Sequence, residues 1–528
     1  MQQQSEAPSG EIFPDTDFAR LVAAASWVSL PMLVAKQARL RPDEAAVVDG
    51  GCAISRRELE LRTHRLARHL VAAGLKPGDR IGLLCENAPA YIELALAAAR
   101  QGFVLAMLNW RLTPAELLEC VNLVQPSLIF VSPQQQDKVE AGLRAAVPCI
   151  ELGADFDAVL AAQSGPLPPD ADVAPEQGLF IAFTSGTSGL PKGAVISHRA
   201  AIARLQLYIM QYGFQPGDTF LAWSPMFHMS SMELALSTLV LGGTVVMSRG
   251  LDLELMCRLL EAGPISNLVL FPGIIEQALA HLAERRPRIA GIRKFGALAD
   301  LLPGQQIKEL TEALQTPFAN TYASTETGIA PASGGKLAIG EFPHDLAKTE
   351  SAFCDVRLVD DAGHPVPDGA IGELVVRGPT VFSGYYGAPE ATQAAFQDGW
   401  YHTGDLFRRR ADGRLDYVDR QKYLIKSGGE NIYPAEIEGA ARGFPSVLEA
   451  AVVRRRDDKW GEVPVLVVAS KGGEADRARL TQHLADKLAR YKQPKDILFV
   501  APDFFPRNNT GKIARNALEA KVGGAAPG

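Results

Sequence analysis

The sequence lacks the features of several protein classes. Its 528 residues include only six cysteines, which are widely spaced and form no Cys-x-x-Cys pair. We therefore expect reduced, mostly buried thiols rather than a disulfide scaffold or a zinc site. No uninterrupted run of about 18 apolar residues suggests a membrane span. The first six residues lack the basic start of a signal peptide, so the cytoplasm is the expected compartment.

A basic surface is also lacking. Lys and Arg number 53 against 60 Asp and Glu, which gives a net charge of −7. This balance removes the usual electrostatic reason for general binding to nucleic acid or anionic membranes, although a local cationic site remains open. The hydrophobic fraction of 47% is typical of a folded globular protein. Because domains usually have roughly 50–250 residues, we expect two or more.

Short apolar runs alternate with amphipathic stretches at residues 45–48, 56–73, 80–85, 90–100 and 103–108, and similar apolar runs recur at 127–131 and 268–271. This alternation predicts an α/β architecture with largely parallel sheets. After about residue 350, Gly-rich turns separate short β-like runs, which predicts a β-rich subdomain. The last segment predicts a small α+β domain, with helices at 435–442 and 477–491 and strands at 450–454 and 463–469.

The most informative stretch is residues 183–193, Phe-Thr-Ser-Gly-Thr-Ser-Gly-Leu-Pro-Lys-Gly. Its glycines let backbone N–H groups turn toward an anion, its hydroxyl groups add donors and its lysine adds positive charge, which suits a polyphosphate. It is not a Walker loop, because Pro191 stands five positions after Gly186 and a strand is expected to follow. The candidate nucleotide-binding residues are Thr184, Ser185, Gly186, Thr187, Ser188, Gly189 and Lys192. Taken alone, such a run is more often a flexible turn.

This stretch resembles the phosphate-loop signature of the adenylate-forming superfamily, which includes acyl-CoA synthetases, peptide-synthetase adenylation domains and firefly luciferase. Further stretches resemble the family's other motifs, in the family's order, at residues 225–228, 320–326, 401–405, 419–422 with 427–438, and 506–513. The resemblance runs from about residue 30 to about 515. Six motifs in this order make a chance match improbable.

The resemblance implies that an acid carboxylate attacks the α-phosphate of ATP and that a thiol then displaces AMP from the acyl-adenylate. It implies that Glu326 is a catalytic residue that binds Mg²⁺, which prefers carboxylate and phosphate oxygens. Thr325 would reach the α-phosphate, and Tyr322 would stack on adenine unless it is a core tyrosine. Asp405 would bind the ribose hydroxyls, and Arg420 would add a donor unless it forms a structural salt bridge.

The resemblance also implies a mobile C-terminal domain. Lys512, in a Thr-Gly-Lys-Ile turn, would hold the substrate carboxylate beside the α-phosphate. Lys422 matches the hinge, and Gly428 and Gly429 match a loop that lines the entry of the thiol. Lys426 either serves thioester formation or is a surface lysine.

The implied fold is α/β, with a large N-terminal region of stacked α/β sheets and a β-rich subdomain, followed by a small mobile α+β domain. We expect an AMP-binding domain at residues 1–420 and a cap domain at 421–528.

The acyl pocket is expected around Phe227, His228, Met229, Gly296, Ala297, Ala323 and Ser324. These residues are mainly apolar and aromatic, so a hydrophobic acid (alicyclic, aromatic or medium-chain fatty) fits better than an amino acid, whose ammonium would need a buried carboxylate. A lone histidine such as His228 is otherwise more often structural. Ala323 stands where the family commonly has Gly, which predicts a narrower pocket floor.

The predicted activity is that of an acyl-CoA synthetase that uses ATP, Mg²⁺ and coenzyme A. One alternative is a stand-alone adenylating enzyme that loads a separate carrier protein. Another is a catalytically idle nucleotide-binding protein, against which the presence of Glu326, Asp405 and Lys512 argues. A monomer or homodimer without a nucleic-acid partner is expected.

Overall fold

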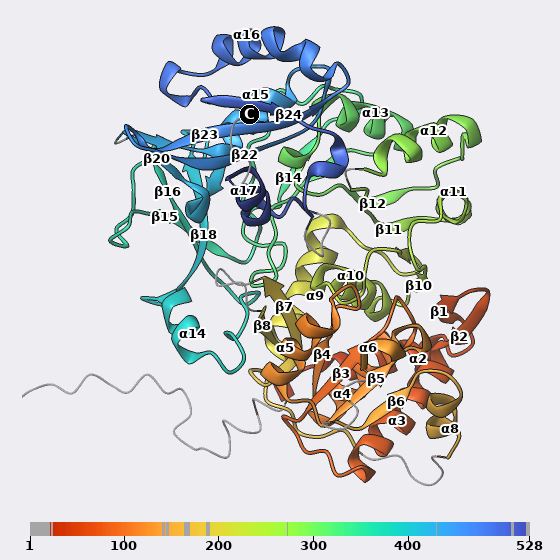
Figure 1. The fold of residues 1–528 in the computed structure, drawn as a ribbon. Coiled ribbons are helices and arrows are strands. Elements are labelled where there is room, and N and C mark those ends of the chain that lie inside the picture. The colour runs from red at the N-terminus through yellow and green to blue at the C-terminus, as the bar shows by residue number, and fades with distance from the viewer. Residues whose placement is uncertain are drawn as a thin grey trace, which may run out of the picture.

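The computed structural model describes residues 22, 25–139, 143, 147–162, 169–185, 191–271, 273–428, 430–507 and 512–523. Its strands form four sheets (Figure 1). No helix among these residues is long and apolar enough to cross a bilayer. Among the described residues the six cysteines form no disulfide, as expected, and three of them are buried. Cys52 is exposed, because it opens a strand at the edge of a sheet.

The first large sheet has six strands, all parallel except the last, which runs antiparallel to its neighbour. In spatial order they are β6 (Cys149–Glu151), β5 (Leu128–Val131), β3 (Arg80–Leu84), β4 (Val104–Met107), β7 (Gly178–Ser185) and β8 (Pro191–Ser197). The helices that alternate with these strands in the chain are α3 (Arg56–Ala72), α4 (Ala90–Gln101), α5 (Pro114–Val124), α6 (Gln136–Val139) and α8 (Ala154–Ala162).

The second large sheet has eight strands, parallel except at its two edges. In spatial order they are β14 (Gly335–Leu337), β13 (Phe318–Asn320), β12 (Ile292–Phe295), β11 (Ile265–Leu268), β9 (Thr219–Ala222), β10 (Thr244–Met247), β1 (Ala45–Asp49) and β2 (Cys52–Ser55). The helices of this region are α2 (Leu30–Leu40), α9 (His198–Tyr212), α10 (Met229–Val240), α11 (Leu253–Ala262), α12 (Ile275–Arg285) and α13 (Gly304–Leu314).

Two smaller sheets complete the structure. The first contains β15 (Asp355–Val359), β16 (Ile371–Arg377), β18 (Trp400–Arg409), β17 (Phe396–Gln397) and β19 (Leu415–Arg420), with α14 (Pro389–Ala395) beside it. The C-terminal sheet, blue in Figure 1, contains β21 (Glu430–Ile432), β20 (Ile425–Ser427), β23 (Gly461–Ser470), β22 (Val447–Asp457) and β24 (Asp496–Phe499). It carries α15 (Pro434–Arg442), α16 (Arg477–Lys487) and α17 (Arg515–Gly523).

Local sequence signals explain several of these elements. Ser55 caps α3, since its hydroxyl oxygen accepts the Glu58 N–H at 3.1 Å. Thr113 and Glu116 form a reciprocal capping box at the start of α5. In the C-terminal domain the buried residues of β22 alternate between two cores, so Val452 packs under α15 and α16 and Val453 packs against α17. This domain therefore buries apolar surface on both faces of its own sheet.

The structure confirms the predicted α/β class, with large stacked sheets, a β-rich part and a smaller C-terminal α+β part. The strand expected at residues 268–271 is wrong, because β11 ends at Leu268 and its last ladder pair is Leu268 with Phe295. The helix expected at 477–491 is shorter than predicted, since α16 ends at Lys487.

Candidate active site

A carboxylate on the third sheet holds two predicted nucleotide-binding residues together. Asp405 in β18 and Arg420 at the end of β19 are paired across the ladder. The Arg420 Nε donates to Asp405 Oδ1 at 2.7 Å, and its Nη2 donates to Oδ2 at 3.3 Å. The Tyr322 hydroxyl donates to the same Oδ2. Burial and the neighbouring Asp405 charge both raise the pKa of Tyr322, so this hydroxyl stays protonated and remains a donor.

The predicted magnesium ligand lies in a second cluster. The Tyr385 hydroxyl donates to Glu326 Oε1 at 3.2 Å, and the Lys192 ammonium lies 4.9 Å from the centre of the Tyr385 ring. The buried Arg204 donates to the Glu326 carbonyl at 3.0 Å, and its guanidinium pairs with Glu233 at 2.8 Å. The contact with Arg204 thus fixes the backbone of Glu326, while the Glu326 side chain is half-buried.

A single carboxylate suits Mg²⁺ in this setting. Mg²⁺ usually takes one or two carboxylates together with substrate phosphates and water. Among the described residues no group of three or more His, Cys, Asp or Glu side chains could hold a metal ion. The hard oxygens of Glu326, near the Lys192 ammonium that would face phosphate, fit a metal that arrives with its nucleotide.

The phosphate-loop motif is described only at its two ends. Thr184 in β7 is the ladder partner of Lys192 in β8, and Ser185 is the partner of Pro191. The other predicted residues of the loop, Gly186, Thr187, Ser188 and Gly189, lie outside the described residues, as does Gly429. The antiparallel pairing means that the loop connects two adjacent strands, which confirms the expectation that a strand follows the motif.

Lys512 lies near the nucleotide cluster although it belongs to the C-terminal domain. Its side chain keeps contact with solvent. Burial by the surrounding protein still lowers its pKa, and the Arg420 charge lowers it further, while Asp405 opposes this shift. The structure therefore brings Lys512, Arg420 and Asp405 into one electrostatic neighbourhood.

His228 links this neighbourhood to the predicted acyl pocket. Burial lowers the pKa of His228 to about 4, and the charges of Arg111 and Lys512 contribute. The imidazole is therefore neutral at pH 7. Its ring centre lies 4.4 Å from that of the buried Phe227, and α10 begins at the buried Met229. These three residues lie next to one another at the start of α10, where the sequence predicts the acyl pocket.

The other pocket residues lie on two neighbouring loops after β12 and β13. The Thr321 N–H donates to the Ala297 carbonyl at 3.0 Å and joins the loops. Gly296 has φ +124, and a Cβ there would lie 2.7 Å from the Ala319 carbonyl oxygen, so only glycine fits. Ala323 is exposed to open space, and Ser324 is half-buried.

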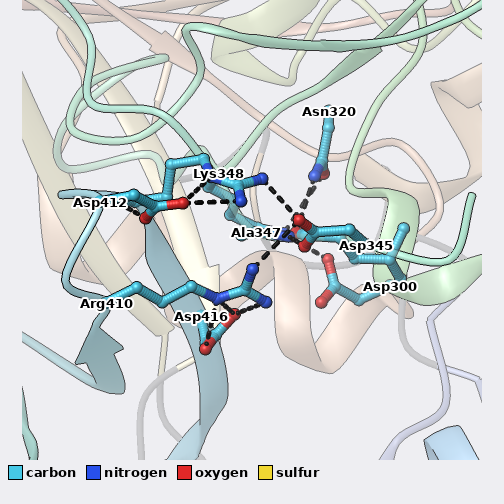
Figure 2. A network of polar contacts seen from close by, with 10 residues as sticks. Asp300, Asn320, Asp345, Ala347, Lys348, Arg410, Asp412 and Asp416 are labelled. Carbon is cyan, nitrogen blue, oxygen red and sulfur yellow. Dashed lines mark hydrogen bonds and ion pairs between the residues drawn. The ribbon is translucent and has the colours of Figure 1, made fainter. Parts of the chain in front are cut away.

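A polar network fixes the loop that follows Ala297 (Figure 2). The buried Lys348 ammonium pairs with Asp300 and donates to Asn320 Oδ1 at 3.2 Å. Nearby, Arg410 donates to Asp345 at 3.0 Å and to Asp416 at 2.9 Å. The network joins the β18–β19 hairpin to the end of β13 and so holds the pocket loop against the third sheet.

The hinge and thiol-loop motifs lie beside the C-terminal sheet. Lys422 is exposed, and its carbonyl accepts Arg454 Nη2 at 2.7 Å. Gly428 has φ +59, and a Cβ there would meet the Trp460 ring at 2.4 Å. Lys426 is exposed, and its backbone N–H donates to Glu462 at 3.0 Å.

Sequence reasoning missed Tyr385 and Arg204, because neither lies in a motif and only the fold brings them to Glu326.

Comparisons with known proteins show the family. The family model described as AMP-binding enzyme matches residues 34–386, and the model described as AMP-binding enzyme C-terminal domain matches residues 436–512. The chain is 34% identical over 498 residues to a feruloyl-CoA synthase from Amycolatopsis sp, covering 92% of this chain and 98% of that protein. It is 32% identical over 498 residues to an indoleacetate–CoA ligase from Aromatoleum aromaticum, covering 92% and 97%.

A solved structure shows the same likeness. The ATP-bound MatB from Rhodopseudomonas palustris is 28% identical, has a TM-score of 0.83 and covers 94% of this chain and 99% of its own. With both family models matched and two relatives above 30% identity over nearly their whole length, the chain belongs to the AMP-binding enzyme family, within the acyl-CoA synthetase branch of the adenylate-forming superfamily.

Proposed function

We propose that this ATP-dependent, AMP-forming carboxylic acid–CoA ligase activates a hydrophobic acid and that Lys512 serves the first of its two steps. The observation that carries this assignment is the position of Lys512 beside Arg420 and Asp405, next to the predicted pocket residue His228. A protein that only binds nucleotide does not need a lysine from a second domain beside these residues.

The first step brings two anions together. An oxygen of the acid forms a bond to the α-phosphorus of ATP, and the bond to the bridging oxygen breaks, so that pyrophosphate leaves. The ammonium of Lys512 would hold the carboxylate against this repulsion, and the Lys192 ammonium would face the phosphates. Glu326 is the residue that would hold Mg²⁺, which would supply positive charge against the phosphates. Asp405, oriented by Tyr322 and Arg420, would accept hydrogen bonds from the ribose.

The second step needs a different arrangement. The thiolate sulfur of coenzyme A attacks the acyl carbon, a thioester forms and AMP leaves. A long thiol arm must approach a site that Lys512 occupies in the first step, so we propose a rotation of residues 421–528 against residues 1–420 about Lys422. Gly428, which matches the thiol loop of the family, would then face the thiol; its left-handed backbone and the nearby Trp460 ring leave room only for glycine at this position.

The apolar surroundings favour an acid with an apolar body. Phe227 and Met229 are buried, and His228 is neutral at pH 7. An aromatic, alicyclic or medium-chain fatty acid buries its surface there without leaving a charge unpaired. The cytoplasm is the proposed compartment, because cysteines that form no disulfide among the described residues, including the exposed Cys52, are typical of a reducing environment.

The test is a pyrophosphate-release assay with ATP and Mg²⁺ over a panel of aromatic, alicyclic and fatty acids. We expect release that depends on the acid, and thioester only after coenzyme A is added. Pyrophosphate release without thioester, followed by acyl transfer only to a phosphopantetheinylated carrier protein, would identify the carrier-loading alternative. ATP binding without acid-dependent turnover over the whole panel would contradict the ligase proposal.

A further inference from the structure

Tyr385 contacts two charged residues of the candidate active site at once. Its hydroxyl donates to Glu326 Oε1 at 3.2 Å, and the Lys192 ammonium lies 4.9 Å from the centre of its ring. An ammonium at this distance from an aromatic ring is attracted to the ring face. One side chain therefore joins the predicted magnesium ligand, which lies on the loop after β13, to the predicted phosphate-binding lysine in β8.

The backbone holds Tyr385 beside β8, the strand that contains Lys192. Tyr385 forms an antiparallel bridge with Ala194 of this strand. Three backbone hydrogen bonds flank the bridge: the Val195 N–H donates to the Gly384 carbonyl at 2.9 Å, the Ser383 N–H to the Val195 carbonyl at 2.8 Å and the Tyr386 N–H to the Gly193 carbonyl at 2.8 Å. The position of Tyr385 is thus set by its backbone and does not depend on its contact with the lysine.

The same segment also fixes Glu326. The Phe382 N–H donates to the Glu326 carbonyl at 2.8 Å, and the buried Arg204 donates to that carbonyl at 3.0 Å. The Phe382 ring packs edge to face against Tyr385, with 4.9 Å between ring centres. Within the described part of the chain, Glu326 Oε2 forms no hydrogen bond or ion pair. One carboxylate oxygen is therefore held by the tyrosine, and the other is available to a metal ion.

A second tyrosine fixes the direction of the hydrogen bond to Glu326. A side-chain hydrogen bond joins Tyr385 to the buried Tyr401. Because a carboxylate only accepts, the single proton of the Tyr385 hydroxyl goes to Glu326, and the Tyr385 oxygen accepts from Tyr401. Burial and the Glu326 charge both raise the pKa of Tyr385, so its hydroxyl stays protonated and remains a donor.

We propose that Tyr385 is a positioning residue that sets the relative placement of the Glu326 carboxylate and the Lys192 ammonium, so that the phosphates of ATP meet the metal ion and the lysine together. This inference rests on the proposed function. Residues that hydrogen-bond to a metal ligand orient that ligand and strengthen metal binding. The hydroxyl then controls the metal-dependent part of ATP binding through Glu326, and the ring controls the metal-independent part through Lys192.

The test measures binding of α,β-methylene-ATP by calorimetry, once with EDTA and once with Mg²⁺. This analogue cannot release pyrophosphate, so binding is measured without turnover. The dissociation constant with EDTA divided by that with Mg²⁺ gives the metal dependence. In Tyr385→Phe, which keeps the ring and removes the hydroxyl, this ratio should fall by roughly 10-fold, as for other lost partners of metal ligands. The dissociation constant with EDTA should stay within about two-fold of wild type, because the ring still faces Lys192.

Tyr385→Leu separates the role of the ring from that of the hydroxyl. It removes both, so the ratio should fall as in Tyr385→Phe. Binding with EDTA should also weaken, by roughly 2- to 30-fold, the range of a cation–π contact. Replacing Mg²⁺ by Mn²⁺ allows bound metal to be counted by electron paramagnetic resonance, and both variants should bind less Mn²⁺ with the analogue than wild type.

The matched control is Tyr386→Phe, which removes the hydroxyl of the next residue, whose ring faces Arg80. This variant should keep the wild-type ratio. If Tyr385→Phe weakens binding by the same factor with EDTA and with Mg²⁺, Tyr385 only supports the packing around Phe382, and the proposal is wrong. A wild-type ratio near 1 also overturns it, whereas acid-dependent pyrophosphate release would still support the ligase function.

Tyr401→Phe tests the same arrangement without changing Tyr385, so this test does not depend on the folding of a Tyr385 variant. It removes the hydroxyl that donates to Tyr385, so the ratio should fall by about two- to ten-fold, the range of a hydrogen bond between neutral groups. A ratio that stays at the wild-type value in both Tyr401→Phe and Tyr385→Phe would exclude control of Glu326 by these hydroxyls.

Discussion

The two sides of the predicted cleft are held in different ways. On the N-terminal side, each carboxylate is held by side chains from other segments of the chain, as Asp405 is by Tyr322 and Arg420 and Glu326 is by Tyr385. On the other side, Lys512 belongs to a domain that packs two cores of its own around its sheet. The predicted nucleotide-binding groups are thus held in place by their neighbours, whereas the position of Lys512 depends on the placement of a whole domain.

This difference predicts which residues serve one step and which serve both. Under the proposed mechanism, a group on the fixed N-terminal side contacts the adenylate throughout, so its loss should affect both half-reactions. A group on the C-terminal domain, which we propose to be movable, would act only while that domain is in place. The predictions below test this division from the largest expected effect to the smallest.

Lys512→Ala should have the largest effect. Without the ammonium, nothing offsets the repulsion between the acid and the α-phosphate, so pyrophosphate release should fall by roughly 10²- to 10³-fold, a loss typical of a removed electrostatic donor. Thioester formation from a supplied acyl-adenylate should be retained. Rapid-quench assays of the two half-reactions measure both rates.

The control is Lys471→Ala, which removes an exposed lysine from a turn of the same domain. Both half-reactions should stay at the wild-type rate in this variant. Equal loss of both half-reactions in Lys512→Ala would contradict the division of labour between the two sides.

Asp405→Asn should weaken nucleotide binding in both half-reactions. The amide keeps the shape of the side chain but removes the charge that pairs with Arg420, and one of its two terminal atoms can no longer accept a hydrogen bond. We expect KM for ATP to rise by about 10- to 100-fold, since hydrogen bonds to charged groups contribute about 1.5–3 kcal/mol. Steady-state kinetics and AMP binding by calorimetry measure the effect.

A suitable control is Asp355→Asn, which removes an exposed ion pair with Arg377 on the same sheet. Such surface pairs contribute little, so ATP kinetics should not change. If Asp405→Asn weakened only the first half-reaction, Asp405 would act in that step alone, as Lys512 is proposed to do, and the division between the two sides would be wrong.

The residues of the fixed side could be predicted from sequence only where a motif names them. Asp405 and Arg420 lie in two separate motifs, and the β18–β19 ladder pairs them, so that Arg420 forms the ion pair that the sequence left open as its alternative role. Tyr385 lies in none, since it reaches Glu326 only through the fold. No spacing rule marks a contact between residues 59 positions apart, such as Tyr385 and Glu326.

The architecture was more predictable than the element ends. The 56–73 and 90–100 stretches carry strong amphipathic or apolar signals, and α3 and α4 follow them closely. The strand expected at 268–271 is wrong because the sheet, and not the local apolar run, sets its end. The position of Lys512 depends on how two domains meet, which periodicity along the chain does not encode.

Asp419→Asn tests the junction between the two sides. The Asp419 carboxylate in β19 accepts the Ala435 N–H of α15 at 2.7 Å. Burial raises the pKa of Asp419 from its ordinary 3.8 to about 6. A raised carboxyl pKa favours the folded state while the group is protonated, below pH 4, and this advantage is lost as the pH rises through 6.

Asn carries no such charge, so Asp419→Asn should gain stability relative to wild type by about 2 kcal/mol between pH 4.5 and 7.5, at 1.36 kcal/mol per pKa unit. Thermal unfolding of both proteins at the two pH values measures the difference in Tm. The exposed Asp355→Asn is again the control, and its Tm difference from wild type should not vary in this range. If the Tm difference between Asp419→Asn and wild type is the same at both pH values, the pKa of Asp419 is not raised in the folded protein, and the prediction is wrong.

Ala323→Gly should have the smallest effect, because it alters only the shape of the fixed side. Ala323 follows Tyr322 on the loop after β13, and its methyl group is exposed to open space rather than packed in the core. Removing a methyl group changes the fit of a ligand by about 1 kcal/mol, so kcat/KM for bulkier acids should rise by roughly five-fold while smaller acids change little. A series of ring-substituted benzoates and straight-chain acids measures this profile. If the profile is unchanged, the methyl group does not narrow the pocket floor, and acid size is then set by side chains such as Phe227 and Met229.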